Sequence, residues 1–481
     1  MDLSQKYQAV IGLEVHAQLA TNSKLFSGDS IAFGNDPNTQ VSPIALAHPG
    51  SLPKLNQQAI EYAVKMGLAC NCTIAEQSFF ARKNYFYPDL PKGYQISQHT
   101  HPICIGGFVT IKTKEGTRAV QLNRIHLEED AGKSIHDLDP NHTCIDLNRA
   151  GTPLIEIVTE PDLFSADEAW QYVTEIRKLV RWIGICDGNM EEGSLRCDAN
   201  ISVKLRGAEQ LGTKVEVKNL NSIRNVKKAI EFEISRIIDE LEKGNRIQQQ
   251  TRSFNADNDT TFSIRDKEEA NDYRYFPDPD LPAIHLTQDY IQSVKELLPA
   301  LPDQLIQHYQ AAYQLSAYDA SQLCEEKSIA VFFEQAIQLT THYKMVANWI
   351  LGPIKQLMNE SKKNIQELGL TVQQLAELIE LIETGKINFS ITASKLLPAI
   401  LHTTTSASEL AETLNLVQVS DSNELEKWIN ETIEAMPEKV KEYQKGKKGL
   451  IGLFVGEVKK KSKGKADPKM VTEMLEQKLN A

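Results

Sequence analysis

Long hydrophobic runs are missing from this chain of 481 residues. No stretch reaches the roughly 18 apolar residues that a membrane span requires, so we expect none to cross a membrane. Met1 to Gln8 lacks a basic start and an apolar core, and we expect no secretion signal there. Cysteine is also sparse: seven residues, odd in number and scattered, do not suit a disulfide framework. These absences predict a protein of the reducing cytoplasm.

Positive charge is scarce overall, because the net charge is −12. That value is not typical of a nucleic-acid-binding protein. The distribution is uneven, however: between Glu438 and Lys469 there are eleven lysines and four acids, a local balance of +7. Such a patch can bind a polyanion on an otherwise acidic protein. A solvated helix face or a mobile tail is the alternative interpretation.

Five stretches alternate between apolar and polar residues as strands do, and each has acids, histidines or bases on one side. In the richest stretch, His126 and Glu128 share a face with Asp130, whereas Glu129 lies on the other face. A lone carboxylate such as Glu156 inside an apolar strand needs a metal, a cation or a proton. The five predicted strands are 11–18, 124–131, 154–158, 194–201 and 214–218.

A sheet built from these strands would have an apolar face covered by helices and a polar, concave face. We expect helices at 57–68, from 166 after a capping box at Ser165, and at 225–243. Several carboxylates on one face suit Mg²⁺, and added Arg and Lys suit phosphoryl transfer. Internal salt bridges, for example to Arg124 or Lys133, are the alternative.

Two segments, 82–94 and 272–280, mix bases with tyrosines and are bounded by proline. Basic and aromatic side chains together suit phosphates, sugars or bases. The alternative is a packed cluster of aromatic rings, against which the aliphatic parts of lysine side chains lie; it would give the same pattern. Helical patterns dominate beyond about residue 290, where we expect no catalysis. Near the end, Gly449, Gly452 and Gly456 predict a small-residue helix face beside the lysines.

Long, specific segments closely resemble the B subunit of the bacterial aspartyl/glutamyl-tRNA amidotransferases, and the resemblance covers essentially the whole chain. It implies an α+β protein with a glutamine-synthetase-like cradle and a mostly antiparallel sheet over 1–294. An all-α helical domain over 295–405 and a small α tail domain over 406–481, which binds tRNA, would follow. The matching segments are 10–16, 82–89, 126–133, 190–201, 218–222 and 272–281.

The resemblance also implies an activity. Members use ATP and Mg²⁺ to phosphorylate the side-chain carboxylate of misacylated Glu-tRNA(Gln) and/or Asp-tRNA(Asn). Ammonia, released from glutamine by an amidase (A) subunit, then displaces phosphate, and a small (C) subunit completes a heterotrimer. Two alternatives are a tRNA-binding scaffold that has lost catalysis and a free-standing ligase of the glutamine-synthetase type.

By the same resemblance, His16, Glu129 and Glu156 match the family's Mg²⁺ ligands. Glu14 and Asp198 match acids beside them, within reach of a second ion that comes with ATP. Lys83 and Arg196 match phosphate contacts or groups on the ammonia path, and Asn219 completes the predicted ATP site. We expect Glu14, Glu129, Asp198 and Lys83 to serve catalysis, and Glu129→Gln to abolish the ATP-dependent step while tRNA binding is kept.

One loop departs from the pattern of many members, which carry a zinc site with two cysteine pairs. The aligned positions here are Ser27, Asp29, Ser42 and Ala45. Alanine cannot bind a metal and serine is a poor zinc ligand, so we predict no zinc.

Overall fold

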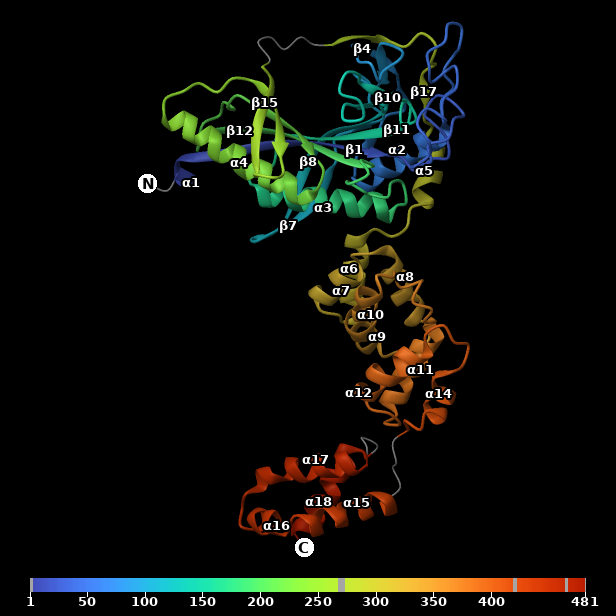
Figure 1. Ribbon diagram of the computed structural model, residues 1–481, viewed down its shortest axis with the longest axis vertical. Coiled ribbons are helices and arrows are strands. Elements are labelled where there is room, and N and C mark those ends of the chain that lie inside the picture. The colour runs from blue at the N-terminus through green and yellow to red at the C-terminus, as the bar shows by residue number, and fades with distance from the viewer. Residues whose placement is uncertain (1–2, 267–272, 418–421, 463–465, 481) are drawn as a thin grey trace. The chain divides into compact units, whose positions relative to one another are not determined.

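A computed structural model describes residues 3–266, 273–417, 422–462 and 466–480. Asp272, Lys463 and Lys465, which belong to segments singled out above, lie outside these ranges. The chain forms two compact units, Met1–Leu301 and Pro302–Ala481 (Figure 1). The first unit extends past the boundary predicted at 294 because α5 (Gln288–Glu296) packs on α2 (Gln57–Ala69).

A sheet of thirteen strands organises the first unit, with the main order β15-β14-β13-β12-β1-β11-β8-β5-β4-β16. Among the described strands of this path, only β13 and β14 pair in parallel. All five predicted strands are present, which confirms the mostly antiparallel α+β fold. The path comprises β1 (Tyr7–Gln18), β4 (Ala81–Asn84), β5 (Tyr94–Ser97), β8 (Gly116–Glu129), β11 (Pro153–Thr159), β12 (Leu195–Leu205), β13 (Val215–Leu220), β14 (Gln250–Asn255), β15 (Thr260–Asp266) and β16 (Arg274–Pro277).

Short strands complete this unit. β2 (Thr73–Ile74), β6 (Cys104–Ile105) and β7 (Phe108–Thr113) extend the large sheet beside β8. Two small pairs stand apart: β9 (Lys133–Ile135) with β10 (Cys144–Asp146), and β3 (Gln77–Ser78) with β17 (Ile284–His285).

Helices α2, α3 (Ala166–Trp182) and α4 (Ile223–Glu242) pack on the sheet (Figure 1). The alternation of β1 explains why: Leu13, Val15 and Ala17 are fully buried, while Glu14 and His16 between them are half-buried. Ser165 caps α3 by accepting a hydrogen bond from the Glu168 N–H. The Glu168 carboxylate accepts from Phe164 N–H rather than Ser165 N–H, so only half of the predicted capping box forms.

The second unit is helical in its described residues, as predicted. Its first part ends with α14 (Ala407–Thr413), which packs on α11 (Val372–Glu383), so the predicted boundary at 405/406 falls in front of a helix that contacts the preceding ones. The other elements of this part are α6 (Pro302–Tyr313), α7 (Ala317–Leu323), α8 (Lys327–Ala336), α9 (Tyr343–Trp349), η1 (Ile350–Ile354), α10 (Lys355–Ser361), α12 (Phe389–Ile391), η2 (Thr392–Leu396) and α13 (Leu397–Ile400).

The last helices, α15 (Ser422–Ala435), α16 (Pro437–Gln444), α17 (Ile451–Lys461) and α18 (Pro468–Asn480), share a hydrophobic cluster of their own. α17 contributes Phe454 and Val458 to that cluster. A Cβ added at Gly452 or Gly456 would meet nothing within 4 Å, so the predicted small-residue face is open. Among the described helices of the whole chain, none has the length and apolarity needed to cross a membrane.

Candidate active site

The uncovered side of the sheet carries a row of charged and imidazole side chains, one from each of four adjacent strands. His16 of β1 lies opposite Arg196 of β12 on one side and Glu156 of β11 on the other. Glu156 in turn lies opposite His126 of β8. Two residues along β1, Glu14 lies opposite Asp198. Because directly opposed residues share a face, the register alone brings these groups together.

These residues line a pocket with a volume of about 670 Å³. Most of the site residues predicted from sequence are in its wall, drawn from strands far apart in the chain. Those residues are Glu14, His16, Lys83, Glu156, Arg196, Asp198 and Asn219.

Glu129 is the exception, because it does not line this pocket; its assignment as a Mg²⁺ ligand stays a prediction. Its carboxylate pairs with Lys92 and accepts the Ile96 N–H at 2.9 Å, on the side of β8 that carries Ile125 and Leu127. Glu128 faces the pocket instead, 3.3 Å from His16 Nδ1. Strand alternation separates the two neighbours, so Glu128 faces His16 and Glu129 does not.

Carboxylates surround the two histidines of the row. His126 Nε2 lies 3.3 Å from Glu156 and 3.8 Å from Glu128. Burial opposes the charged imidazoles, but Glu156 and Glu128 outweigh it and raise the pKa of both His16 and His126 to about 9. Burial likewise opposes ionisation of Glu156, yet the two imidazoles lower its pKa to about 2. The row is therefore a network of compensating charges.

For Glu14 the compensation is incomplete, because His16 and Asn200 lower its pKa less than burial and the neighbouring acids raise it. Burial first, and the charge of Glu156 second, raise its pKa, and the Asn200 amide donates to its carboxylate at 2.8 Å. The cluster thus presents crowded carboxylates that a bound cation would stabilise.

The donor set fits a divalent ion. Glu14, His16 and Glu156 offer ligand atoms within 4.8 Å of one another, and so do Glu14, Asp198 and Glu216. His16 Nδ1 is buried and, despite the nearby Glu128, lacks a well-aligned hydrogen bond, which leaves it available as a ligand. The all-carboxylate group matches the oxygen preference of Mg²⁺ most closely.

Three cations face the acids. Arg196 donates to Asp130 at 2.8 Å, and Lys218 bridges Asp198 and Glu216 at 2.8 and 2.9 Å. Lys83 lies over the rings of Tyr273 and Tyr85, 4.7 and 5.7 Å from their centroids. Burial works against its charge, but Glu128 and nearby groups still raise the pKa of Lys83. A charged phosphoryl group would therefore meet cations at several points of the wall.

Asn219 lies where β13 leaves regular pairing with β12, and its φ is 66°. Asparagine tolerates this left-handed conformation better than most residues. The turn brings it into the pocket wall next to Lys218.

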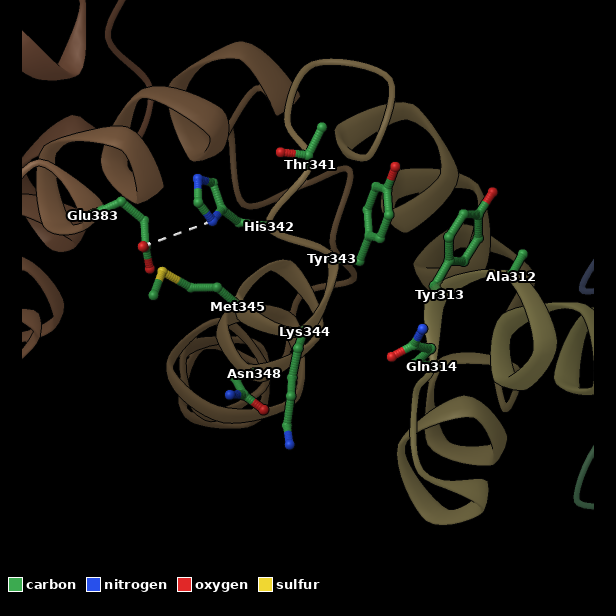
Figure 2. A pocket seen from close by; sticks show the side chains of 10 residues that line it. All are labelled: Ala312, Tyr313, Gln314, Thr341, His342, Tyr343, Lys344, Met345, Asn348 and Glu383. Carbon is green, nitrogen blue, oxygen red and sulfur yellow. Dashed lines mark ion pairs between the residues drawn. The ribbon is translucent and has the colours of Figure 1, made fainter.

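A second cavity lies in the helical unit, lined by Tyr313, Tyr343, Lys344, Asn348 and neighbours (Figure 2). Its lining contains one carboxylate, Glu383, which lies 3.7 Å from His342 Nδ1. A single acid already facing an imidazole does not make a Mg²⁺ site. The pocket on the sheet is therefore the candidate active site.

Sequence reasoning noticed but did not assign Glu128, His126, Glu216 and Lys218. Alternation along β8 and β13 was the available signal, since it placed Glu128 with His126 and Glu216 with Lys218. His99 was missed altogether, and nothing in its local sequence distinguishes it, whereas Lys92 lies in segment 82–94 but received no role of its own.

The fold and the site define a class: an α+β protein whose mostly antiparallel sheet carries a pocket of acids and facing cations and is followed by helices. Residues 9–292 match the family model described as GatB/GatE catalytic domain, and residues 331–479 match the one described as GatB domain. The chain belongs to the family of aspartyl/glutamyl-tRNA(Asn/Gln) amidotransferase B subunits.

Relatives with that printed name are similar along nearly their full lengths. One from Thermodesulfovibrio yellowstonii is 49% identical, with 98% of each chain covered. Relatives from Chlorobium phaeobacteroides and Geotalea daltonii are each 48% identical, with 98% of this chain and 99% of theirs covered.

The early loop that contains Ser27, Asp29 and Ser42 is held by hydrogen bonds. Asp29 accepts from the Ser27 hydroxyl at 2.8 Å and from the Ser42 N–H at 3.0 Å. The expectation that this loop binds no zinc stays a prediction.

Proposed function

We propose that this chain carries the ATP- and Mg²⁺-dependent step that converts misacylated Glu-tRNA(Gln) and/or Asp-tRNA(Asn) into the correct amide. The side-chain carboxylate of the tRNA-bound amino acid attacks the γ-phosphorus of ATP, the bond to ADP breaks, and an acyl phosphate forms. Ammonia then forms the C–N bond, phosphate leaves with the C–O electron pair, and it accepts the proton lost from nitrogen.

The observation that carries the proposal is that the acids and imidazoles of the cross-strand row share one pocket with Lys83, Arg196 and Lys218. A carboxylate oxygen is a poor leaving group until it is phosphorylated, and phosphoryl transfer needs positioned cations. In the proposed site, Lys83 and Arg196 orient the transferring group, while Asn219 and Lys218 contact the nucleotide.

Glu14, His16, Glu128, Glu156 and Asp198 would hold the ion or ions. Bound Mg²⁺ would neutralise charge on the phosphoryl oxygens. His16 must be neutral to serve as a ligand, so its competing proton makes binding of the ion depend on pH.

The partners follow from the name shared by the relatives, which describes a subunit of a larger enzyme. We propose an amidase subunit as the source of ammonia and a small subunit that completes a heterotrimer. The helical unit and the tail would bind the tRNA, since the tail concentrates lysine.

The test is ATP hydrolysis by the assembled enzyme with Mg²⁺, with and without misacylated tRNA. Hydrolysis should rise only with the misacylated tRNA and disappear in Glu128→Gln. Lys243→Ala, a change at the exposed C-terminal cap of α4, is the control and should behave as the unchanged protein. Binding of tRNA without any response of ATP turnover would instead support a scaffold.

A further inference from the structure

Asp130, directly after the end of β8, places a buried carboxylate in the wall of the pocket on the sheet; the residue is 4% exposed. Its Oδ1 accepts a hydrogen bond from the Ala131 N–H at 3.0 Å. Its Oδ2 accepts from the Arg196 guanidinium and from the Gln18 amide, both at 2.8 Å. A charge buried so deeply needs partners of this kind. Since both oxygens already accept hydrogen bonds within the chain, the carboxylate is placed to hold other side chains rather than to contact a ligand.

The backbone of Asp130 is held as well as its side chain. Its N–H donates to the Thr152 carbonyl at 2.9 Å, and its carbonyl accepts from the Gly151 N–H at 2.8 Å. The pairing of β8 with β11 thus continues just beyond the two strands. A side chain can be placed no more accurately than the group that holds it, so this rigid base suits an anchor.

Two neighbours of Asp130 reach it from outside the pocket on the sheet. Gln18 of β1 and Arg149 line a separate cavity of about 400 Å³. Arg149 Nε lies 3.7 Å from Asp130 Oδ2 and donates to the Ala131 carbonyl at 2.9 Å. Neither Gln18 nor Arg149 lines the pocket that contains Arg196. A change at Gln18 would therefore act on that pocket through Asp130.

The pair with Asp130 determines how the Arg196 side chain lies. Asp130 binds the Nη2 atom, and because a guanidinium is planar and rigid, a bond at one nitrogen restricts the directions of the others. The charge of Asp130 is the first cause that raises the pKa of Arg196, ahead of the charges of Glu128 and Asp198. Those two acids line the same pocket and would compete for the guanidinium without Asp130. Asp130 thus favours one orientation of Arg196 among those that the pocket offers.

We propose that Asp130 is a positioning residue for Arg196 and that Gln18 supports it from outside the pocket. The inference rests on the proposed function, in which Arg196 orients the transferring phosphoryl group. In that reaction the negative charge of the transition state has to be met by donors that are already in place. Loss of the correct position of Arg196 should therefore lower kcat more than it raises KM for the tRNA.

The experiment is a double-mutant cycle on the assembled enzyme, with Asp130→Asn, Arg196→Ala and the two changes combined. Formation of the amide on misacylated tRNA, with ATP, Mg²⁺ and glutamine present, gives kcat and KM. Asp130→Asn should lower kcat about ten- to a hundredfold, which is the usual contribution of a hydrogen bond to a charged group. In the Arg196→Ala background the same change should lower kcat less than about twofold, because Asp130 acts through Arg196.

Gln18→Met is a second variant, and its cycle with Arg196→Ala decides the question if Asp130→Asn does not fold. It keeps the charged pair and removes one donor to the carboxylate. Its kcat should fall about two- to tenfold when Arg196 is present and less than about twofold when Arg196 is absent. Asp162→Asn is the matched control, because Asp162 pairs with Arg118 at 3.1 Å outside the pocket lining. This control should leave kcat unchanged in both backgrounds.

The outcomes separate this inference from the proposed function. Equal losses with and without Arg196 would show that Asp130 serves folding alone and would overturn the inference, while ATP hydrolysis still stimulated by tRNA would leave the proposed function standing. Losses confined to the enzyme with Arg196, together with ATP hydrolysis that never responds to tRNA, would uphold the positioning and reject the proposed function. A raised KM for the tRNA with unchanged kcat would assign Asp130 to binding and also overturn the inference.

Discussion

Glu128 and Glu129 are neighbours in β8, yet their carboxylates have different surroundings. Glu128 faces His16 and His126 in the pocket, and Glu129 pairs with Lys92 on the buried side. Removing the first charge should affect the chemistry, and removing the second should affect folding. The two positions therefore form a natural pair for comparison.

We expect Glu128→Gln to reduce ATP-dependent turnover by at least about a hundredfold, because it removes an acid from the phosphoryl-transfer site. Glu129→Gln should instead lower the free energy of unfolding by about 3 kcal/mol, because it leaves the partly buried Lys92 without its partner. Turnover and chemical denaturation measured on both variants check this. Equal stability of the two variants would contradict the assignment.

The histidine row predicts a dependence of stability on pH. The pKa of His126 is about 9 in the folded chain, against the ordinary value of 6.5 that applies to the unfolded chain. Since the folded value is the higher one, this stabilisation is complete below pH 6.5 and is lost as pH rises through 9.

Without added metal, the free energy of unfolding should fall as the pH rises between these two values. The fall should be larger in the unchanged protein than in His126→Gln, by on the order of 2 kcal/mol. Denaturant titrations in chelator at the two pH values provide the measurement. Parallel pH profiles for the two proteins would show that His126 is not charged in the folded state.

At the scale of elements, α17 has apolar side chains on its inward side, and a Cβ added at its glycines, Gly452 and Gly456, would contact no other residue. Gly456→Ala should raise the free energy of unfolding of the tail by up to about 1 kcal/mol, because alanine favours the helix and its Cβ has room. Thermal unfolding of the full chain measures the effect. If RNA lies against this face, the same change should weaken tRNA binding, whereas unchanged binding would remove the glycine face from the RNA contact.

Strands and helices of the first unit were predictable because their periodicity is strong. In β8, alternation placed Glu128 and His126 on one face, and both line the pocket; Glu129, which the family resemblance selected as a ligand, lies on the other face. The pairings themselves were not predictable, since β1 lies between β11 and β12, far along the chain. Lys92 could not be identified in advance because its role depends on a partner from β8.

At the scale of the whole molecule, an acidic chain concentrates lysine at one end. Several of these lysines are paired with nearby acids: Lys439 and Lys447 with Glu442, and Lys460 with Glu457. Pairing reduces the charge available to a polyanion, so the contribution of the patch has to be measured.

Replacing Lys459, Lys460 and Lys461 together by alanine should raise the Kd for tRNA. The slope of log K against log salt should become shallower by up to about 0.9 for each lost phosphate contact. Titrations at several salt concentrations test this, with Lys243→Ala in the first unit as the control. An unchanged slope would identify the lysines as a solvated helix face.

The uneven burial of the cysteines has a practical use in spectroscopy. Six of the seven thiols are buried, and Cys144 on β10 is partly exposed. Burial also raises the pKa of Cys72 and Cys186 to about 12, which keeps those thiols unreactive at neutral pH. A maleimide dye should therefore label the native chain at Cys144 first. The unmodified sequence would then carry a single optical reporter on the catalytic unit, and following tRNA arrival by fluorescence would require no engineered cysteine.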